Sequence, residues 1–219
     1  YVHRTALALA ATARPGDRVA VFSSSWKDRL RAPSPDIETR DARVPVRLLN
    51  RAWHRLEWPP VEWLAGPTDV AHSPTPLLLP ARRAAQVVTI HDLFFLDHPE
   101  GTAAEIRRDY PTLVGDHARR ADLVVTVSAT VGAQVARRLD VDPARIVTCP
   151  NGAPDWTPRA AVPTDGPVIA VGTLEPRKNI AGLLDAWTCL LEGGLRVPLL
   201  LAGGAPSSAA PLLERLTRP

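Results

Sequence analysis

The sequence has no methionine, two cysteines, and only two lysines among its 26 Lys and Arg residues. Cys149 and Cys189 have neither the density of a disulfide framework nor the spacing of a zinc site, which suits a reducing compartment. No apolar run approaches the roughly 18 residues that a bilayer span requires, so no transmembrane helix is expected. Because the chain has no methionine, we expect the natural start, with any targeting signal, to lie before Tyr1.

Several well-known catalytic motifs are also missing. The sequence contains no GxGxxG, no Walker P-loop, no GxSxG and no HExxH. Dehydrogenase, kinase, serine hydrolase and metalloprotease functions therefore lose the motifs on which they depend.

The composition is that of an ordinary globular protein. Of 219 residues, 45% are hydrophobic and 22% are charged, and the formal net charge is +3. This charge is too small to indicate a nucleic-acid partner. Basic residues are nevertheless concentrated in the first part of the chain, which could face an anionic partner.

Hydrophobic periodicity predicts short apolar strands that alternate with amphipathic helices. This pattern is typical of an α/β fold in which helices cover parallel sheets. A polar stretch at 23–41, with two prolines, predicts a loop. The remaining expected strands are 18–22, 69–72, 87–90, 123–127, 145–148, 168–171 and 197–202, and the expected helices are 5–13, one opening at Pro45, 102–120, 129–139, 180–191 and 212–216.

The stretch 151–167 is rich in proline and glycine and lacks helical periodicity, so it predicts an interdomain linker. We therefore expect a first domain over residues 1–155. Residues 156–219 would form the linker and the start of a second domain.

The octapeptide GTLEPRKN, residues 172–179, follows an expected strand and precedes an expected helix. Gly172 permits a tight departure from the strand, and Asn179 can cap the helix. Arg177 and Lys178 are then expected at a helix N-terminus, where cations and free N–H groups act together on phosphate. The alternative is a solvated, charged loop. The rarity of lysine in this chain favours a phosphate contact at Lys178.

A second polar cluster follows the expected strand at 87–90. His91 and Asp92 come first, and the apolar run 93–96 would anchor their loop. Ser128 is expected mainly to cap a helix. Asn151 and Gly152 are expected to form a turn, with a ligand contact left open by their place at the hinge.

Four arginines follow one another at four-residue spacing: Arg43, Arg47, Arg51 and Arg55. With Trp53, Trp58 and Trp63 nearby, they could hold the protein against an anionic membrane or a lipid-linked acceptor. A solvated helix face with tryptophans in the core is the alternative, and we favour it.

Six segments together carry a family resemblance: HSP at 72–74, TIHDLFFLDHP at 89–99, ADLVVTVSA at 121–129, PNG at 150–152, VGTLEPRKNIAGLLDAW at 171–187 and LLLAGG at 199–204. In this order the sequence resembles the retaining glycosyltransferases of family 4, and more narrowly their bacterial mannosyltransferase-like members. The resemblance covers almost the whole chain.

The resemblance implies the GT-B architecture, in which two Rossmann-like domains face a cleft. The first domain mainly holds the acceptor and the second holds a nucleotide-sugar donor. It implies donor-diphosphate contacts at Arg177 and Lys178, in a loop that also offers Gly172 and Thr173, and contact of His91 with the donor sugar. Thr173 departs from the basic residue of many relatives.

The resemblance further implies that the family's first strand and glycine-rich loop lie before Tyr1, and its carboxylate motif beyond Pro219. We therefore expect a hexosyltransferase, with mannose favoured as the sugar, that needs no metal or other cofactor. Its expected partners are a nucleoside-diphosphate sugar and a glycan or lipid-linked acceptor, and no nucleic acid. A cytoplasmic location is expected, with contact at the inner face of the membrane left open.

Two other functions are compatible with these residues. A sugar-nucleotide epimerase uses the same twin-domain architecture. A non-catalytic module that binds a sugar nucleotide or a glycan belongs to a different class.

Overall fold

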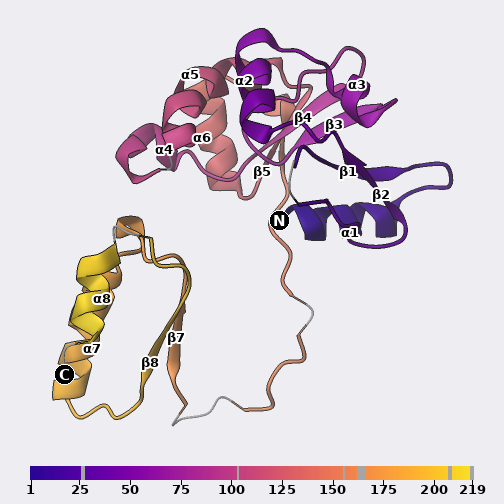
Figure 1. The fold of residues 1–219 in the computed structure, drawn as a ribbon. Coiled ribbons are helices and arrows are strands. Elements are labelled where there is room, and N and C mark those ends of the chain that lie inside the picture. The colour runs from indigo at the N-terminus through magenta and orange to yellow at the C-terminus, as the bar shows by residue number, and fades with distance from the viewer. Residues whose placement is uncertain (26–27, 103, 155, 162–165, 207–208, 218–219) are drawn as a thin grey trace. The chain divides into compact units, whose positions relative to one another are not determined.

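A computed structural model describes residues 1–219 except 26–27, 103, 155, 162–165, 207–208 and 218–219. The chain divides into two compact units, Tyr1–Ala153 and Pro154–Pro219, which are described separately below (Figure 1). The predicted linker over 151–167 contains no helix or strand among its described residues. Residue 155, at which the predicted first domain ends, lies outside the described part of the chain.

The first unit opens with a helix and a pair of parallel strands. These are α1 (Val2–Thr12), β1 (Val19–Ser23) and β2 (Ile37–Asp41). Ala6, Val21 and Ile37 form their small buried core. The loop predicted for 23–41 is therefore wrong at its end, because β2 pairs with β1 throughout. The sequence IETRD has only one apolar residue, so its hydrophobic pattern does not indicate a strand.

Two helices follow. The first, α2 (Val46–Leu56), begins immediately after Pro45, as predicted, because proline already has a backbone angle compatible with the first turn. Its buried face includes Leu49 and Trp53. The second, α3 (Val61–Ala65), is a single short turn that the sequence did not reveal.

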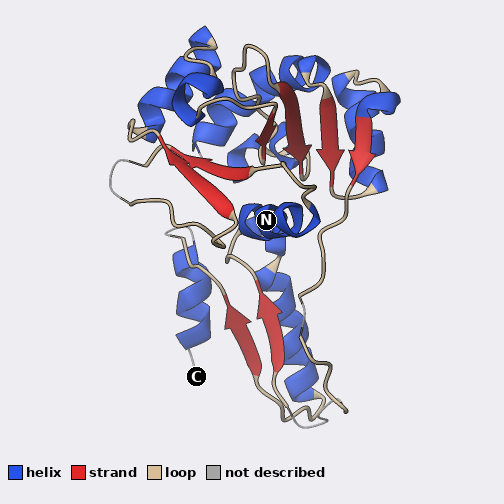
Figure 2. Ribbon diagram, turned by 90° about the vertical axis from the view of Figure 1, so that its right-hand side faces the viewer, coloured by secondary structure: helices blue, strands red, loops and turns tan. Residues whose placement is uncertain are grey.

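A four-stranded parallel sheet forms the centre of the first unit. Its strands lie in the order of the chain: β3 (Val70–Ser73), β4 (Ala85–Ile90), β5 (Leu123–Thr126) and β6 (Ile146–Thr148). Figure 2 shows these strands pointing in one direction. Their carboxyl ends therefore meet at one edge of the sheet, where ligands bind in open α/β proteins.

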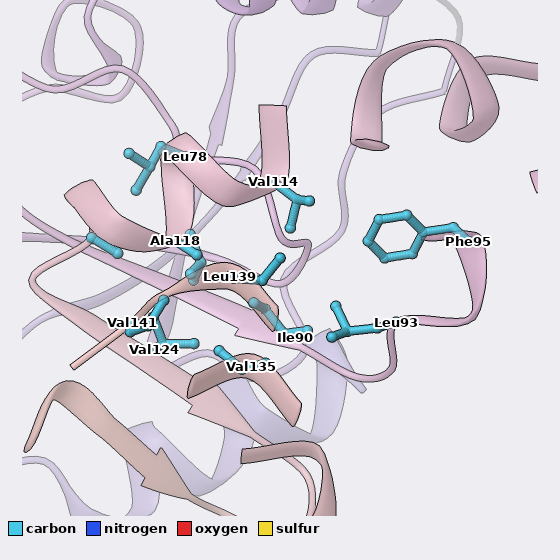
Figure 3. Packing of buried hydrophobic residues seen from close by; sticks show 12 residues of the cluster. Leu78, Ile90, Leu93, Phe95, Val114, Ala118, Val124, Val135, Leu139 and Val141 are labelled. Atoms are coloured by element: carbon cyan, nitrogen blue, oxygen red, sulfur yellow. The ribbon is translucent and has the colours of Figure 1, made fainter. Parts of the chain in front are cut away.

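Helices connect these strands and close the main core. They are α4 (Phe94–Asp97), η1 (Pro99–Gly101), α5 (Ala104–Arg120), α6 (Ala129–Leu139) and η2 (Pro143–Arg145). Val88, Ile90 and Val124 of the sheet, Val114 of α5 and Val135 of α6 are almost fully buried together. Figure 3 shows Ile90, Val124, Val114 and Val135 in this core. Apolar side chains on both elements explain why these amphipathic helices pack onto the sheet.

The second unit has the same strand and helix alternation. It consists of β7 (Val168–Val171), η3 (Pro176–Lys178), α7 (Ile180–Glu192), β8 (Leu199–Ala202) and α8 (Ala210–Thr217). The strands β7 and β8 pair in parallel. The predicted α/β class with parallel sheets is therefore confirmed in both units.

Among the described residues, no helix combines the length and apolarity needed to cross a membrane. Cys149 and Cys189 are both exposed and free.

Candidate functional site

Main-chain hydrogen bonds join the loop after β7 to the loop after β8. The N–H of Gly172 donates to the carbonyl of Ala202 at 2.9 Å, and the N–H of Leu174 donates to that of Gly204 at 2.9 Å. Leu174 is buried, at 8% exposure. Strand pairing thus continues past the ends of both strands. This pairing fixes the start of the loop at 172–179 that is predicted to bind phosphate, which we call the phosphate loop.

Lys178 lies over the bare backbone of Gly172. A β-carbon placed on Gly172 would stand 3.7–3.9 Å from the Cγ, Cδ and Cε atoms of Lys178. Lys178 is exposed, and Gly172 and Thr173 are half-buried. The aliphatic stem of the lysine therefore rests on the loop beyond β7 while its exposed side chain remains accessible to a ligand.

The predicted cap at Asn179 is confirmed. Asn179 has a left-handed backbone (φ 47°), and its side-chain oxygen accepts a hydrogen bond from the N–H of Gly182 at 3.3 Å. Arg177 and Lys178 lie in the 3-10 turn η3, immediately before this cap, rather than in the first turn of α7. They are still beside the positive end of the helix dipole.

Arg177 already has an ionic partner within its own loop. Its Nε donates to a carboxylate oxygen of Glu175 at 2.8 Å, and both side chains are partly exposed. A diphosphate at this loop would therefore share or displace the Glu175 carboxylate. Lys178 has no such ion pair among the described residues, which makes it the more available cation.

The second predicted cluster lies at the carboxyl end of β4. His91 is half-buried, and the carboxylate of Asp92 accepts a hydrogen bond from the N–H of Phe94 at 3.0 Å. Leu93 and Phe95 enter the main core at 2% and 5% exposure (Figure 3). The prediction that the apolar run anchors this loop is confirmed, because these side chains hold the segment that follows His91.

Three residues near His91 form a network that the sequence reasoning missed. The ring of Tyr1 stands edge-on to His91, with ring centroids 4.6 Å apart. The Tyr1 hydroxyl is 3.1 Å from Oγ1 of Thr89, and Nε2 of His72 is 2.8 Å from the same atom. Thr89 is fully buried, and burial lowers the pKa of His72 below its ordinary value. A neutral His72 is thus part of the support of this loop.

Strand register explains part of this network. His72 of β3 lies opposite Val87 of β4, and Thr89 is two residues further along the same strand. Residues two apart in a strand share a face, so His72 and Thr89 point to the same side. The motifs that contain both residues were visible in the sequence, but their pairing was not. Tyr1 gave no signal, because its contact is entirely tertiary.

The remaining candidates are Ser128, Asn151 and Gly152. Ser128 caps α6 by accepting a hydrogen bond from the N–H of Val131 at 3.2 Å, as predicted. Since β4 and β5 are neighbours, with Ile90 opposite Thr126, Ser128 follows the strand next to that of His91.

Asn151 and Gly152 are exposed and form no turn, so the prediction of a turn at these two residues is wrong. A β-carbon placed on Gly152 would meet no atom within 4 Å, and the residue is not among the glycines with positive φ that favour a tight turn.

One side-chain group has the composition of a metal site. Glu57, Asp116 and His117 have potential ligand atoms within 4.8 Å of one another. Arg120 donates to Glu57 at 2.5 and 2.8 Å and to Asp116 at 2.9 Å, and Nδ1 of His117 accepts the N–H of Leu78. The arginine already supplies the positive charge at this place, so the group is a structural ion cluster.

The structure thus places each set of candidates within its own unit. His91, Asp92 and Ser128 follow neighbouring strands of the first unit. Gly172, Thr173, Arg177 and Lys178 belong to one loop of the second unit. Chemically, the first set offers an imidazole and the second offers cations and N–H groups suited to phosphate oxygens.

Part of the chain is similar in sequence to known proteins. A family model described as Glycosyltransferase Family 4 matches residues 1–155. The chain is 31% identical to O-antigen chain mannosyltransferase B of Escherichia coli over 147 residues, which are 61% of this chain and 38% of that protein. It is 30% identical to Serotype-specific mannosyltransferase WbdA of Escherichia coli over 148 residues, which are 58% of this chain and 18% of that protein. The chain therefore spans well under half the length of these relatives.

Proposed function

This chain belongs to glycosyltransferase family 4, and on that premise we propose that it takes part in transferring a hexose from a nucleoside-diphosphate sugar to a glycan or lipid-linked acceptor. The observation that carries the proposal is the family match across the whole first unit. The loop at 172–179 supports it, because it offers phosphate-binding groups on the second unit. Retention of the anomeric configuration is the outcome proposed for the transfer.

The proposed chemistry follows the movement of charge. The acceptor hydroxyl oxygen forms a bond to the anomeric carbon as the bond between that carbon and the diphosphate oxygen breaks. Negative charge grows on the departing diphosphate, which takes up the proton of the acceptor hydroxyl. Lys178, Arg177 and the N–H groups at the start of α7 would stabilise that charge without reorganising. Protein cations thus take the part that a metal ion has in other transferases, so we propose that no metal is needed.

His91 is proposed to contact the donor sugar. Its loop is anchored in the core and its ring is held by Tyr1, so its position is defined before any ligand arrives. Prior positioning of this kind lowers the entropic cost of aligning donor and acceptor. Asp92 stabilises the same loop through its hydrogen bond to Phe94.

Mannose is the sugar proposed first. Both Escherichia coli relatives described above are named as mannosyltransferases. GDP-mannose is therefore the donor with which an assay should begin, followed by UDP sugars as the alternative.

We also propose contact with an anionic membrane, at the cytoplasmic face. Trp58 and Trp63 are 55% and 59% exposed and stand edge to face, while Leu56 is 71% exposed. Only Trp53 of the three tryptophans is buried, so the interpretation that placed all of them in the core is wrong. Exposed aromatic side chains next to arginines favour a bilayer interface. In a flotation assay with anionic vesicles, Trp58→Ser with Trp63→Ser should reduce binding of the protein to the vesicles. Unchanged flotation would show that these tryptophans do not contact the membrane.

The donor loop can be tested on the chain itself. GDP should raise its thermal stability, since binding at about 100 times Kd stabilises the folded state by about 2.7 kcal/mol. Lys178→Ala should remove most of this effect. Arg159→Ala deletes an exposed cation elsewhere in the second unit and serves as the matched control. If Lys178→Ala and Arg159→Ala give the same shift as the parent chain, Lys178 is not in the donor site.

Transfer itself separates the proposed function from its alternatives. The intact protein should move labelled mannose from GDP-mannose to an acceptor. An epimerase would only interconvert free nucleotide sugars, and a binding module would retain the nucleotide sugar without turnover. Either of these two results would replace the transferase proposal.

A further inference from the structure

A second cationic region lies in the first unit, in a groove between α2 and α5. The groove has a volume of about 720 Å³, which is within the range of small-molecule sites. Its α2 wall carries Arg47, Arg51 and Arg55, and its α5 wall carries Glu105, Arg108 and Asp109. We call it the α2–α5 groove.

The α2 wall holds an unbalanced row of positive charge. Arg47, Arg51 and Arg55 are one helical turn apart, and α2 contains no Asp or Glu. Among the described residues, none of the three side chains makes a hydrogen bond or an ion pair with the protein. Like charges at this spacing destabilise a helix, and a cation in its first turn opposes the helix dipole. A bound anion would relieve both effects.

The α5 wall is fixed by contacts to α2. Asp109 is 13% exposed, accepts two hydrogen bonds of 2.7 Å from Arg108, and lies 3.0 Å from Nδ1 of His54. The Arg108 guanidinium, and then the His54 ring, hold the pKa of Asp109 below its ordinary value. The amide of Asn50 donates to Glu105 at 2.8 Å. These links hold the two walls together before any ligand binds.

The same contacts leave the arginine row without a neutralising partner. Both carboxylates of the α5 wall are engaged by Arg108, His54 or Asn50. The lining has four arginines against two carboxylates, so it remains positive. Guanidinium groups offer forked donors that match phosphate oxygens, which selects phosphate over a simple point anion.

We propose that the α2–α5 groove binds a phosphate or diphosphate group, with Arg51 and Arg108 contacting it from opposite walls and Arg47 at one end. Within the proposed transferase function, this group belongs to the acceptor side. The phosphate can come from a diphosphate-linked acceptor or from the headgroup of an anionic phospholipid. The site is separate from the donor loop at 172–179, because it is built from the first unit alone.

Binding of inorganic pyrophosphate, measured by calorimetry, tests the groove without any transfer reaction. The chain used carries Arg177→Ala and Lys178→Ala, which remove the proposed donor-phosphate contacts. Arg47→Gln with Arg51→Gln should then weaken pyrophosphate binding by about tenfold or more, as expected for the loss of charged hydrogen bonds. Among the described residues, neither the Arg47 nor the Arg51 side chain makes a hydrogen bond or an ion pair, so we expect this double variant to fold as the parent chain does.

A matched control and a second variant complete the experiment. Arg82→Gln with Arg83→Gln removes the same charge from an exposed surface outside the groove and should leave binding unchanged. Arg108→Gln tests the opposite wall. Because Arg108→Gln also removes the partner of Asp109, the folding of this variant is checked by circular dichroism. If Arg108→Gln unfolds, the result for Arg47→Gln with Arg51→Gln decides whether the groove binds pyrophosphate.

The source of the phosphate is distinguished with vesicles of phosphatidylglycerol and, for comparison, phosphatidylcholine. Loss of pyrophosphate binding alone in the groove variant assigns the site to a diphosphate ligand, and loss of phosphatidylglycerol binding alone assigns it to a lipid headgroup. Equal binding of both probes by the groove variant and the control would overturn the proposal. No binding by the parent chain would overturn it as well. None of these results depends on whether the protein transfers a sugar.

Discussion

The carbonyl oxygen of Gly172 lies directly against Gly203, so closely that a β-carbon on Gly203 would overlap it. These glycines immediately follow the neighbouring strands β7 and β8. The close approach allows the N–H groups of Gly172 and Leu174 to reach the carbonyls of Ala202 and Gly204. The predicted phosphate loop thus takes its position from a contact between two backbones.

Gly203→Ala should displace this loop. The added methyl overlaps main-chain atoms that cannot move aside, so we expect the second unit to lose about 1–3 kcal/mol of stability. GDP binding should weaken in parallel, because Lys178 rests on Gly172. Denaturant titration and calorimetry check both effects.

Gly204→Ala is the control for this variant. Its new methyl would meet only Cγ2 of Thr173, at 3.9 Å, which is an ordinary contact. Stability and GDP affinity should therefore stay near those of the parent chain. Equal behaviour of the Gly203 and Gly204 variants would mean that the backbone contact does not position the loop.

Removal of the Tyr1 ring should disturb His91. An edge-to-face ring pair contributes about 0.5–1.5 kcal/mol, so Tyr1→Ala should lower kcat of the intact enzyme by up to about tenfold. Tyr1→Phe keeps the ring and loses only the hydroxyl contact to Thr89, and should retain most activity. The ring-proton chemical shifts of His91 should change in the alanine variant and remain in the phenylalanine variant. If the His91 chemical shifts are unchanged in both variants, Tyr1 does not hold the His91 ring.

Glu62→Gln should destabilise the first unit. One carboxylate oxygen of Glu62 accepts the N–H groups of Arg82, Arg83 and Ala84 at 2.9–3.1 Å. Although burial raises the pKa of Glu62, these backbone donors lower it to about 2. A neutral amide makes weaker bonds here, so we expect a loss of about 1–3 kcal/mol in the free energy of unfolding.

The same carboxylate predicts an acid dependence. Its lowered pKa means that its stabilisation is present above about pH 4.5 and is lost as the pH falls towards about 2. Urea titrations across this range should show a smaller loss in Glu62→Gln than in the parent chain. Glu192→Gln, at an exposed position on α7, serves as the control substitution. An identical acid response of the parent and Glu62→Gln would contradict the assigned contacts.

His117 should make the protein less stable as the pH falls below about 6.5. Burial, and then the charge of Arg120, lower the pKa of His117 from its ordinary value of 6.5. Between the lowered pKa and 6.5 the unfolded chain binds more protons than the folded protein, so the free energy of unfolding decreases with decreasing pH. Protonation of Nδ1 would also remove the hydrogen bond from Leu78.

His117→Gln should flatten this part of the stability curve, because its amide oxygen can accept the same N–H without titrating. Urea midpoints measured between about pH 5 and about pH 7.5 check the slope. Part of the slope should persist, since burial lowers the pKa of His72 in the same direction. A slope that is unchanged by the substitution would exclude His117 as its source.

Local pattern was sufficient for most of the elements. Clear amphipathic or apolar segments, such as Ala129–Leu139 and Val168–Val171, were predicted with their observed bounds. The caps at Ser128 and Asn179 were also predictable, because a cap depends on residues within one helical turn. The strand Ile37–Asp41 was missed, since its polar residues carry no periodic signal and only its partner β1 identifies it.

The sequence by itself determined the α/β class, the family resemblance and the loop that carries Arg177 and Lys178, because each of these depends on residues close together in the chain. Only the tertiary structure decided that Tyr1 and Thr89 support His91, that Gly203 positions Gly172, and that two helices enclose a cationic groove. These contacts join residues far apart in sequence, and their geometry depends on strand register and helix packing, which no local pattern specifies.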